Sequence, residues 1–334
     1  MAQEEEKSFE VVLGELFQAE HLPIAELYRL SDLPAAEWAA FVAGWTAVPD
    51  ERRRAIVRHL ADISEDNFIV NFAPIFIHSF ADSHPEVRIA ALDGLWDATD
   101  IKLIPRITEL MQHDPAEEVR AAAAGALGHY VLLAEWGQLP ERILPGLIDT
   151  LLAEYDKEET AESVQRVLLE ALGAADHPRV SKLIEVAYEQ GDPLRQISAV
   201  FAMGNSADRR WTVTVLGEME SPYEDMRAEA ARAAGTIGSS DFVPQLADLA
   251  YDEDLGVRLA AVTSLGQIGG DDVQRILANM LDDPEVEEID ELFEVVEEAL
   301  EEATMMAGAF DFVDFPFDDE EDAEDFADDL DLDE

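Results

Sequence analysis

Side chains that could catalyse a reaction or bind a metal are few in this sequence, apart from its carboxylates. The chain has no cysteine, which excludes thiolate metal sites, and no two of its seven histidines are four residues apart, which excludes a two-histidine zinc face on a helix. His84, His113 and His177 stand beside proline or aspartate, where helix capping is expected. The 75 acidic residues are too numerous for any pair to indicate acid–base chemistry. We therefore predict no catalytic residue, no metal and no cofactor.

The glycines form a repeat instead of a phosphate-binding loop. Gly173, Gly204, Gly235 and Gly266 follow one another at intervals of 31 residues. Most of these glycines end a segment that begins with Val-Arg or a variant of it and continues with small residues, as in LGVRLAAVTSLG (255–266). Gly128 ends a segment of the same kind, EEVRAAAAGALG (117–128). Such a period predicts an array of helix pairs, in which each glycine ends a second helix.

Prolines accompany the repeat. Pro74, Pro105 and Pro244 lie 14 or 15 residues before an arginine of the repeat. Because proline removes a backbone donor, we expect each of them to bend the apolar first helix of its pair.

The pattern resembles the HEAT-repeat family, in particular the bacterial HEAT-like repeats first associated with phycobilisome lyases. The resemblance covers roughly residues 34–302 and rests on the first-helix prolines, on aspartates near the turn and on arginines of the second helix. It implies a structural ladder of hydrogen bonds, interrupted where Gln165 and Gln196 replace the arginine. The predicted ladder arginines are Arg88, Arg120, Arg227 and Arg258, and the aspartates are Asp82, Asp114 and Asp252.

We therefore predict an all-α fold, an α-solenoid of about eight or nine helix pairs with a disordered acidic C-terminal tail. The expected boundaries are an N-terminal helical cap at 1–33, the solenoid at 34–304 and the tail at 305–334. The longest uncharged stretch, 67–81, is too short to span a bilayer and is expected to form a buried helix.

The resemblance indicates a fold more than a function, because HEAT arrays serve in transport, scaffolding and translation and also in some enzymes. Proteins with these repeats serve as scaffolds and adaptors, and our first hypothesis is a non-enzymatic, possibly chaperone-like scaffold. The alternatives are a bilin lyase-like protein that presents a tetrapyrrole to an acceptor protein, and a structural subunit of a larger assembly. The di-iron deoxyhypusine hydroxylases carry a similar repeat, but the His-Glu dipeptides of that family do not occur here.

Charge restricts the partners. With 22 basic and 75 acidic residues the net charge is −53, which repels nucleic acid and anionic membranes and favours a basic protein partner. The first residues, MAQEEEK, lack a cationic region followed by an apolar one, so we expect a cytoplasmic protein. The oligomeric state stays open.

The C-terminal segment combines phenylalanine with acidic residues. One hypothesis is a motif that binds a basic partner, and the other is a solvating tail or one that folds back onto the solenoid. The residues singled out for partner binding are Phe310, Phe312, Phe315, Phe317, Phe326, Asp318, Asp319, Glu320 and Glu321.

An insertion interrupts the period between Gly128 and Gly173. It contains Tyr130 and Trp136, for which both partner binding and ordinary packing in longer helices are open. Trp38 and Trp45, seven residues apart, lie on one face of one expected helix, where core packing and a docking stripe are both open.

Overall fold

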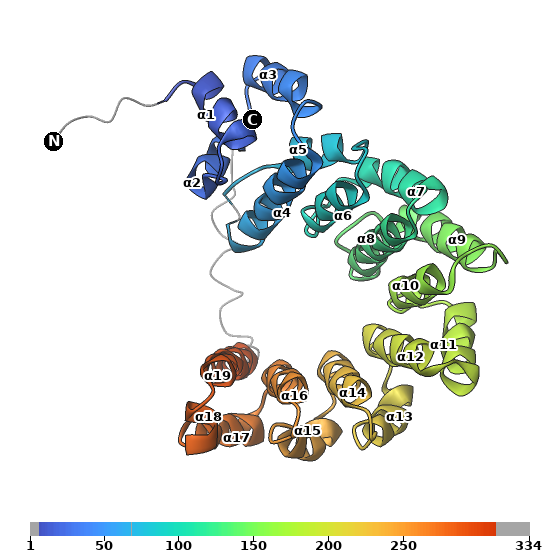
Figure 1. Cartoon of the computed structure of the whole chain (residues 1–334). Helices are drawn as coiled ribbons and strands as arrows, with labels where there is room; N and C mark the ends of the chain where they lie inside the picture. The colour runs from blue at the N-terminus through green and yellow to red at the C-terminus, as the bar shows by residue number, and fades with distance from the viewer. Residues whose placement is uncertain (1–6, 68, 312–334) are drawn as a thin grey trace, which may run out of the picture. The chain divides into compact units, whose positions relative to one another are not determined.

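The protein is helical throughout the part of the chain that the computed structural model describes, residues 7–67 and 69–311 (Figure 1). No strand occurs within these residues, which confirms the all-α prediction. The chain divides into two compact units, residues 1–208 and 209–334.

The first unit holds twelve α-helices among its described residues. They are α1 (Phe9–Gln18), α2 (Ile24–Leu27), α3 (Ala35–Trp45), α4 (Asp50–Asp66), α5 (Ala73–Ser79), α6 (Pro85–Asp93), α7 (Ile104–His113), α8 (Glu117–Glu135), α9 (Leu144–Tyr155), α10 (Glu162–Leu172), α11 (Pro178–Gln190) and α12 (Pro193–Asn205). Short 3-10 turns are η1 (Tyr28–Leu30), η2 (Ile101–Leu103) and η3 (Glu141–Ile143).

The second unit continues the same order of elements. Its helices are α13 (Thr212–Glu218), α14 (Glu224–Ile237), α15 (Val243–Leu249), α16 (Leu255–Ile268), α17 (Asp271–Leu281), α18 (Pro284–Glu287) and α19 (Asp290–Asp311), with the 3-10 turns η4 (Arg209–Trp211) and η5 (Ser240–Phe242). Helix α19 therefore continues past residue 304, where we placed the end of the solenoid.

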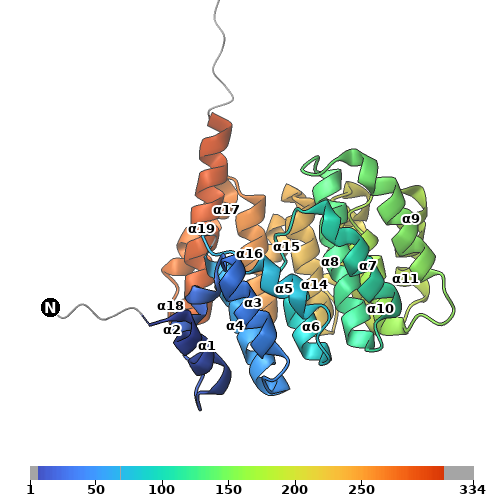
Figure 2. The ribbon, with the colours of Figure 1, turned by 90° about the horizontal axis from the view of Figure 1, so that it is seen from above.

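Helices pack in consecutive pairs within each unit. The pairs are α5 with α6, α7 with α8, α9 with α10 and α11 with α12 in the first unit, and α13 with α14, α15 with α16 and α17 with α19 in the second. Second helices also pack on the next second helix, as α4, α6, α8, α10 and α12 do in turn (Figures 1 and 2). This stacking makes each unit a solenoid of helix pairs, as predicted.

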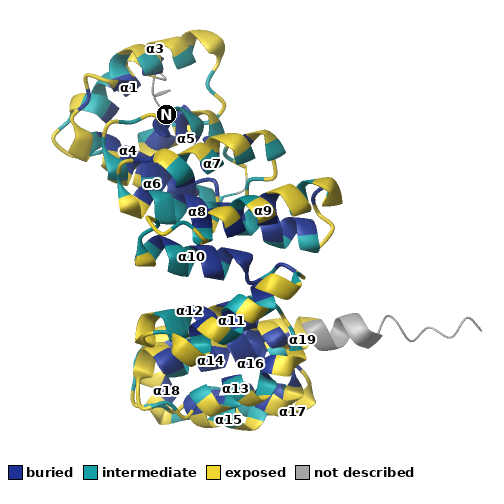
Figure 3. Ribbon diagram, turned by 90° about the vertical axis from the view of Figure 1, so that its right-hand side faces the viewer, coloured by how far each residue is buried: buried dark blue, intermediate teal, exposed yellow. Residues whose placement is uncertain are grey.

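The buried residues lie where these helices face one another (Figure 3). In α8 the side chains of Val119, Ala123, Leu127 and Val131 are buried, at the spacing of one helical face. At the N-terminal end, where we predicted a cap, α1 and α2 pack on α4.

A repeated aspartate precedes four of the helices, α6, α8, α16 and α18. The carboxylates of Asp82, Asp114, Asp252 and Asp283 each accept the backbone N–H two residues further along, at 2.9 to 3.0 Å. Such an Asx turn directs the chain out of the first helix and fixes the direction in which the second begins.

The repeated prolines do not bend the first helices, so that prediction is wrong. Pro74, Pro105, Pro145 and Pro244 all lie in the first turn of α5, α7, α9 and α15. A proline in the first turn removes an N–H that has no partner inside the helix, so it starts the helix without distorting it.

The repeated glycines mark close approaches between second helices. A Cβ atom added to Gly128, Gly173 or Gly266 would lie 2.8 to 2.9 Å from the Cα of an alanine on the next second helix. The prediction that these glycines end helices holds for Gly173 and is wrong for Gly235 and Gly266, which lie inside α14 and α16. At Gly128, Gly173 and Gly266 the backbones of two second helices lie so close together that a larger side chain would not fit between them.

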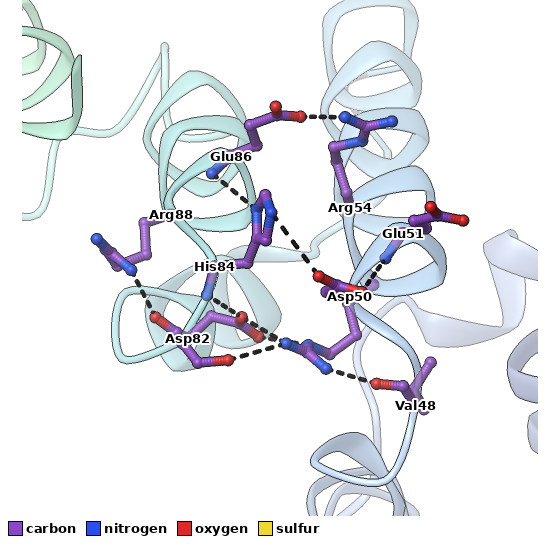
Figure 4. Close-up of polar contacts among 10 residues, drawn as sticks. Val48, Asp50, Glu51, Arg54, Asp82, His84, Glu86 and Arg88 are labelled. Carbon is purple, nitrogen blue, oxygen red and sulfur yellow. Dashed lines mark hydrogen bonds and ion pairs between the residues drawn. The ribbon is translucent and has the colours of Figure 1, made fainter. Parts of the chain in front are cut away.

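Arginines tie consecutive repeats together through ion pairs (Figure 4). Arg53 of α4 donates from Nε and Nη2 to the carboxylate of Asp82 at 2.7 and 2.9 Å, and from Nη1 to the carbonyl of Val48. Arg88 of α6 donates in the same way to Asp114, at 2.7 and 2.6 Å, and to the carbonyl of Asp82 at 2.8 Å. Each arginine therefore joins its own turn to the next one.

The ladder changes along the chain. Arg227 pairs with Asp252 through Nε and Nη2 at 2.8 and 2.7 Å, and Arg120 donates to the carbonyl of Asp114 at 2.9 Å. Arg258, one repeat after Arg227, differs: its Nε and Nη2 are buried and have no hydrogen-bond partner in the part of the chain that the structure describes.

Glutamine occupies the arginine position in two repeats. Gln165 and Gln196 donate to the backbone carbonyls of Tyr155 and Tyr188, at 3.3 and 3.0 Å. Arg195 of the following repeat donates to Gln165 at 2.6 Å. The bond inside the repeat is thus kept in both cases, and at Gln165 a hydrogen bond from the guanidinium of Arg195 to the neutral amide oxygen takes the place of the ion pair.

We expect Gly266→Ala to destabilise the second unit by about 1–3 kcal/mol, because the new methyl group would overlap the backbone of Ala299. Gly217→Ala is the matched control. Gly217 lies in α13 with nothing within 4 Å of an added Cβ, so this change should stabilise its helix by about 0.5–1 kcal/mol. Urea unfolding of both variants measures the difference, and equal effects would contradict the close approach.

We expect Arg227→Met to cost about 3 kcal/mol of unfolding free energy, because it leaves the mostly buried carboxylate of Asp252 without its cation. Arg258→Met should cost clearly less, since it removes two buried donors that have no partner. Similar losses for both variants would argue against a stabilising role of the inter-repeat pair.

The same pair makes a prediction about pH. Hydrogen bonds from Arg227 lower the pKa of Asp252 below its ordinary value of 3.8. The contribution of the pair is therefore present above that ordinary value and is lost as the pH falls through the lowered pKa of the folded state. The stability gap between the wild type and Arg227→Met should narrow below about pH 4.

Candidate functional site

An open groove lies on the second-helix side of the first unit, between α6, α8 and α10. Its volume is about 420 Å³. We call it the Trp96 groove. It is lined by Leu92, Asp93, Leu95, Trp96, Ala121, Ala122, Gly125, Ala126, His129 and Val167.

The floor of the groove is the outward face of α8. Helical spacing places Ala121, Ala122, Gly125 and Ala126 on this face, opposite the residues that α8 buries in the core. An added Cβ on Gly125 would lie 3.6 Å from Val167, so the space above this glycine is open to a side chain. Small residues thus leave a hollow where most second helices present longer side chains.

Trp96 forms a wall of the groove from the turn that follows α6. Its backbone N–H donates to the carbonyl of Asp93 at 3.1 Å, which holds the turn against the helix end. The side chain is 41% exposed, a large apolar surface for a residue of this size. The groove is therefore suited to an apolar or aromatic side chain of a partner.

One edge of the groove is charged. Arg58 of α4 pairs with Asp93 at 3.0 Å. Arg54, one turn earlier in α4, pairs with Glu86 (Figure 4). Burial raises the pKa of Asp93 above its ordinary value, against the opposing effect of Arg58. These exposed pairs join α6 to α4 along the groove edge.

His129 supplies the polar group at the other end of the groove. Its Nε2 is buried and has no hydrogen-bond partner among the described residues, and burial lowers its pKa below the ordinary 6.5, against the opposing effect of Asp97. The imidazole is therefore neutral at pH 7. A neutral imidazole can exchange one hydrogen bond with a bound segment, and the other residues that line the groove include no serine, cysteine or lysine.

The described residues were also compared with the requirements of a metal cluster and of a membrane-spanning helix. They contain no cluster of three or more histidine, aspartate or glutamate side chains that could hold a metal. Within the same residues no helix is both long and apolar enough to cross a bilayer. Nδ1 of His84 and of His177 accepts the N–H at the start of α6 and α11, at 3.3 Å each, which is the capping role expected for them.

The two aromatic residues of the insertion lie in different environments. Tyr130 is only 1% exposed, and its hydroxyl donates to the carbonyl of Asp100 at 3.3 Å, so we correct its partner-binding assignment to core packing. Burial raises the pKa of Tyr130 to about 12. Trp136, at the end of the 19-residue helix α8, is 65% exposed and keeps its candidacy for partner binding.

The remaining predicted sites are placed as follows. Trp45 is buried and donates from Nε1 to Asp82 at 3.2 Å, while Trp38 stacks on Phe41 and is partly exposed. Phe310 lies within α19, but its side chain is outside the described residues. The other tail residues, Phe312, Phe315, Phe317, Phe326, Asp318, Asp319, Glu320 and Glu321, also lie outside them.

Sequence reasoning missed the Trp96 groove, because it used the small residues of 117–128 only to define the repeat and did not ask which of them would face outward. One signal was available. An amphipathic helix normally places polar residues on its outward face, whereas this segment has small residues on both faces.

The repeats also match known proteins. A family model described as HEAT repeats matches residues 46–128, 73–149 and 212–295, which together make up more than half of the chain. No curated protein matches the chain in sequence.

Solved structures with a similar arrangement include human deoxyhypusine hydroxylase in complex with glycerol, 18% identical, covering 90% of this chain and 98% of that one with a TM-score of 0.35. Another is YibA of E. coli, with 13% identity, 91% and 99% coverage and a TM-score of 0.37. A third is an engineered protein, with 17% identity, 89% and 88% coverage and a TM-score of 0.38.

Proposed function

This chain belongs to the HEAT-repeat family, and we propose on that basis that it is a non-enzymatic scaffold or adaptor that binds a basic protein. The observation that carries the proposal is the Trp96 groove. It combines an open apolar floor with an exposed tryptophan, and its polar residues are an ion pair and a neutral histidine. This set of groups suits recognition better than catalysis.

The charge of the chain supports a basic partner. A net charge of −53 attracts cationic proteins over several ångströms and accelerates their encounter. The apolar groove would then anchor a partner that electrostatics has brought close. In binding of this kind the association rate falls as the salt concentration rises, because salt screens the attraction. The apolar contact mainly sets the dissociation rate.

The tail is proposed as a second element of the same function. Its phenylalanines, among them Phe312, Phe315 and Phe317, alternate with carboxylates, a composition that suits binding of a basic segment by coupled folding. Trp136 at the end of α8 is a further candidate contact.

The groove can be blocked by filling its floor. We expect Gly125→Leu to reduce partner binding at least tenfold, because the new side chain would occupy the space over Gly125. It should leave the fold intact or stabilise α8 by about 0.5–1 kcal/mol, since glycine disfavours a helix. Gly146→Leu in α9 is the matched control, because nothing lies within 4 Å of an added Cβ there.

The measurement is capture from native lysate by the wild type and both variants, quantified by mass spectrometry. A protein retained by the wild type and by Gly146→Leu but lost from Gly125→Leu supports the groove. Equal retention by all three would exclude it as the binding site. Recovery of a complex with fixed stoichiometry at high salt would favour the structural-subunit alternative.

The tail is tested separately by a chain ending at Asp311, which keeps all of α19. We expect this truncation to weaken binding and to reduce its dependence on salt, because it removes 13 of the 75 acidic side chains. Binding that stays unchanged in affinity and in salt dependence would leave the tail with a solvating role.

A further inference from the structure

A second apolar groove lies in the second unit, between α17 and α19. Its volume is about 360 Å³, and we call it the end groove. It is lined by Leu281 of α17 and by Glu297, Leu300, Glu301, Thr304 and Met305 of α19.

The end groove uses a different face of α19 from the one that packs in the core. Leu292, Val296, Ala299 and Ala303 are buried, and α19 packs on α16. The groove residues recur at intervals of three and four residues along a second stripe of the helix. Helix α19 therefore has, beside the apolar face that contacts the preceding repeat, a second face on which Leu300 and Met305 stand among polar residues.

The second face has no covering repeat. Within the second unit, α14 is covered by α16 and α16 by α19, whereas no second helix follows α19 in the described residues. Met305 is accordingly 73% exposed, a high value for a large apolar side chain on the last turns of a stack.

The rim of the end groove is acidic and uncompensated. Glu297 and Glu301 line it four residues apart, and Glu294, Glu298 and Glu302 form like-charged pairs of the same spacing beside them. No lysine or arginine follows Arg275 in the sequence. Like charges at this spacing destabilise a helix, and a cationic ligand would remove that effect.

Three occupants of the end groove are compared by their charge: the chain beyond α19, a second copy of the chain and a basic helix of another protein. The chain beyond α19 is itself strongly acidic, and a second copy of the chain would also bring a net charge of −53 to the acidic rim. Both would place carboxylates against carboxylates. A basic helix with an apolar stripe matches both the floor and the rim.

We propose that the end groove docks a basic amphipathic helix of a partner protein. Apolar side chains of this helix at intervals of three and four residues contact Leu281, Leu300 and Met305, and its lysines or arginines pair with Glu297 and Glu301. The inference rests on the proposed function for the basic character of the partner, but it concerns a different surface from the Trp96 groove.

The probe is a fluorescein-labelled helical peptide of lysine and leucine in an amphipathic pattern, titrated with the full chain and followed by anisotropy. A glutamate–leucine peptide of the same pattern is the negative control. We expect the lysine peptide to bind at least tenfold more tightly. Equal binding of the two peptides would overturn the proposal.

Two variants separate docking from diffuse attraction. Leu300→Glu and Met305→Glu add negative charge, so non-specific electrostatics would strengthen the binding of a cationic peptide. Docking in the groove predicts the opposite, a loss of at least tenfold, because a carboxylate replaces an apolar contact. Val213→Glu, on the exposed surface of α13, is the matched control and should not weaken binding. Tighter binding by all three variants would overturn the proposal.

The acidic rim has its own control. The double variant Glu297→Gln/Glu301→Gln should bind the lysine peptide several fold more weakly, and its affinity should depend less on salt concentration. Glu220→Gln/Glu253→Gln removes the same charge elsewhere on the unit and should change little. Equal effects of the two double variants would assign binding to the overall charge and contradict a built groove.

Two further results keep this inference distinct from the proposed function. Gly125→Leu should bind the peptide with the affinity of the wild type. Met305→Glu should retain the partner captured through the Trp96 groove at the level of the wild type. Loss of partner capture by Gly125→Leu, with no peptide binding at the end groove, would overturn this inference alone. A dimer in sedimentation that Met305→Glu dissolves would identify a second copy as the occupant and overturn it as well.

Discussion

The close approach of consecutive second helices is the constraint on which the rest of the structure depends. At Gly128 and Gly266 the backbone of one second helix lies so near an alanine of the next that a Cβ atom would not fit. This distance sets the stacking of the repeats. It also brings the turn of one repeat within reach of an arginine of the previous one, as Arg88 and Asp114 show.

Helix α8 has small residues on two sides, and the stacking of the repeats accounts for only one of them. Helix α8 needs Ala124 and Gly128 on the sides that meet its neighbours, and its outward face carries small residues too. Packing explains the first group but gives no reason for the second. A hollow over Gly125, with Trp96 at its wall, is therefore a feature that stacking alone does not demand.

The sequence predicted the repeat, because its period of 31 residues and the recurring arginine report directly on backbone geometry. The roles predicted for the prolines and for some of the glycines were wrong. A proline is compatible with either a bend or a first turn, and a glycine with either a helix end or a close contact, so spacing alone leaves both open. The Trp96 groove was harder to predict, since it combines α6, α8 and α10 and its one signal in the sequence is that small residues lie on both faces of 117–128.

The use of the basic residues finally explains the charge of the surface. The chain has 22 of them against 75 acidic residues, and many that the structure describes, including Arg53, Arg88 and Arg227, are committed to pairs between neighbouring helices. Holding the repeats together therefore uses cations that would otherwise neutralise the surface. The carboxylates that have no basic partner concentrate on segments such as α19, because no lysine or arginine follows Arg275 in the sequence. The basic partner that we propose would relieve that repulsion, which would link the means of stability to the chemistry of recognition.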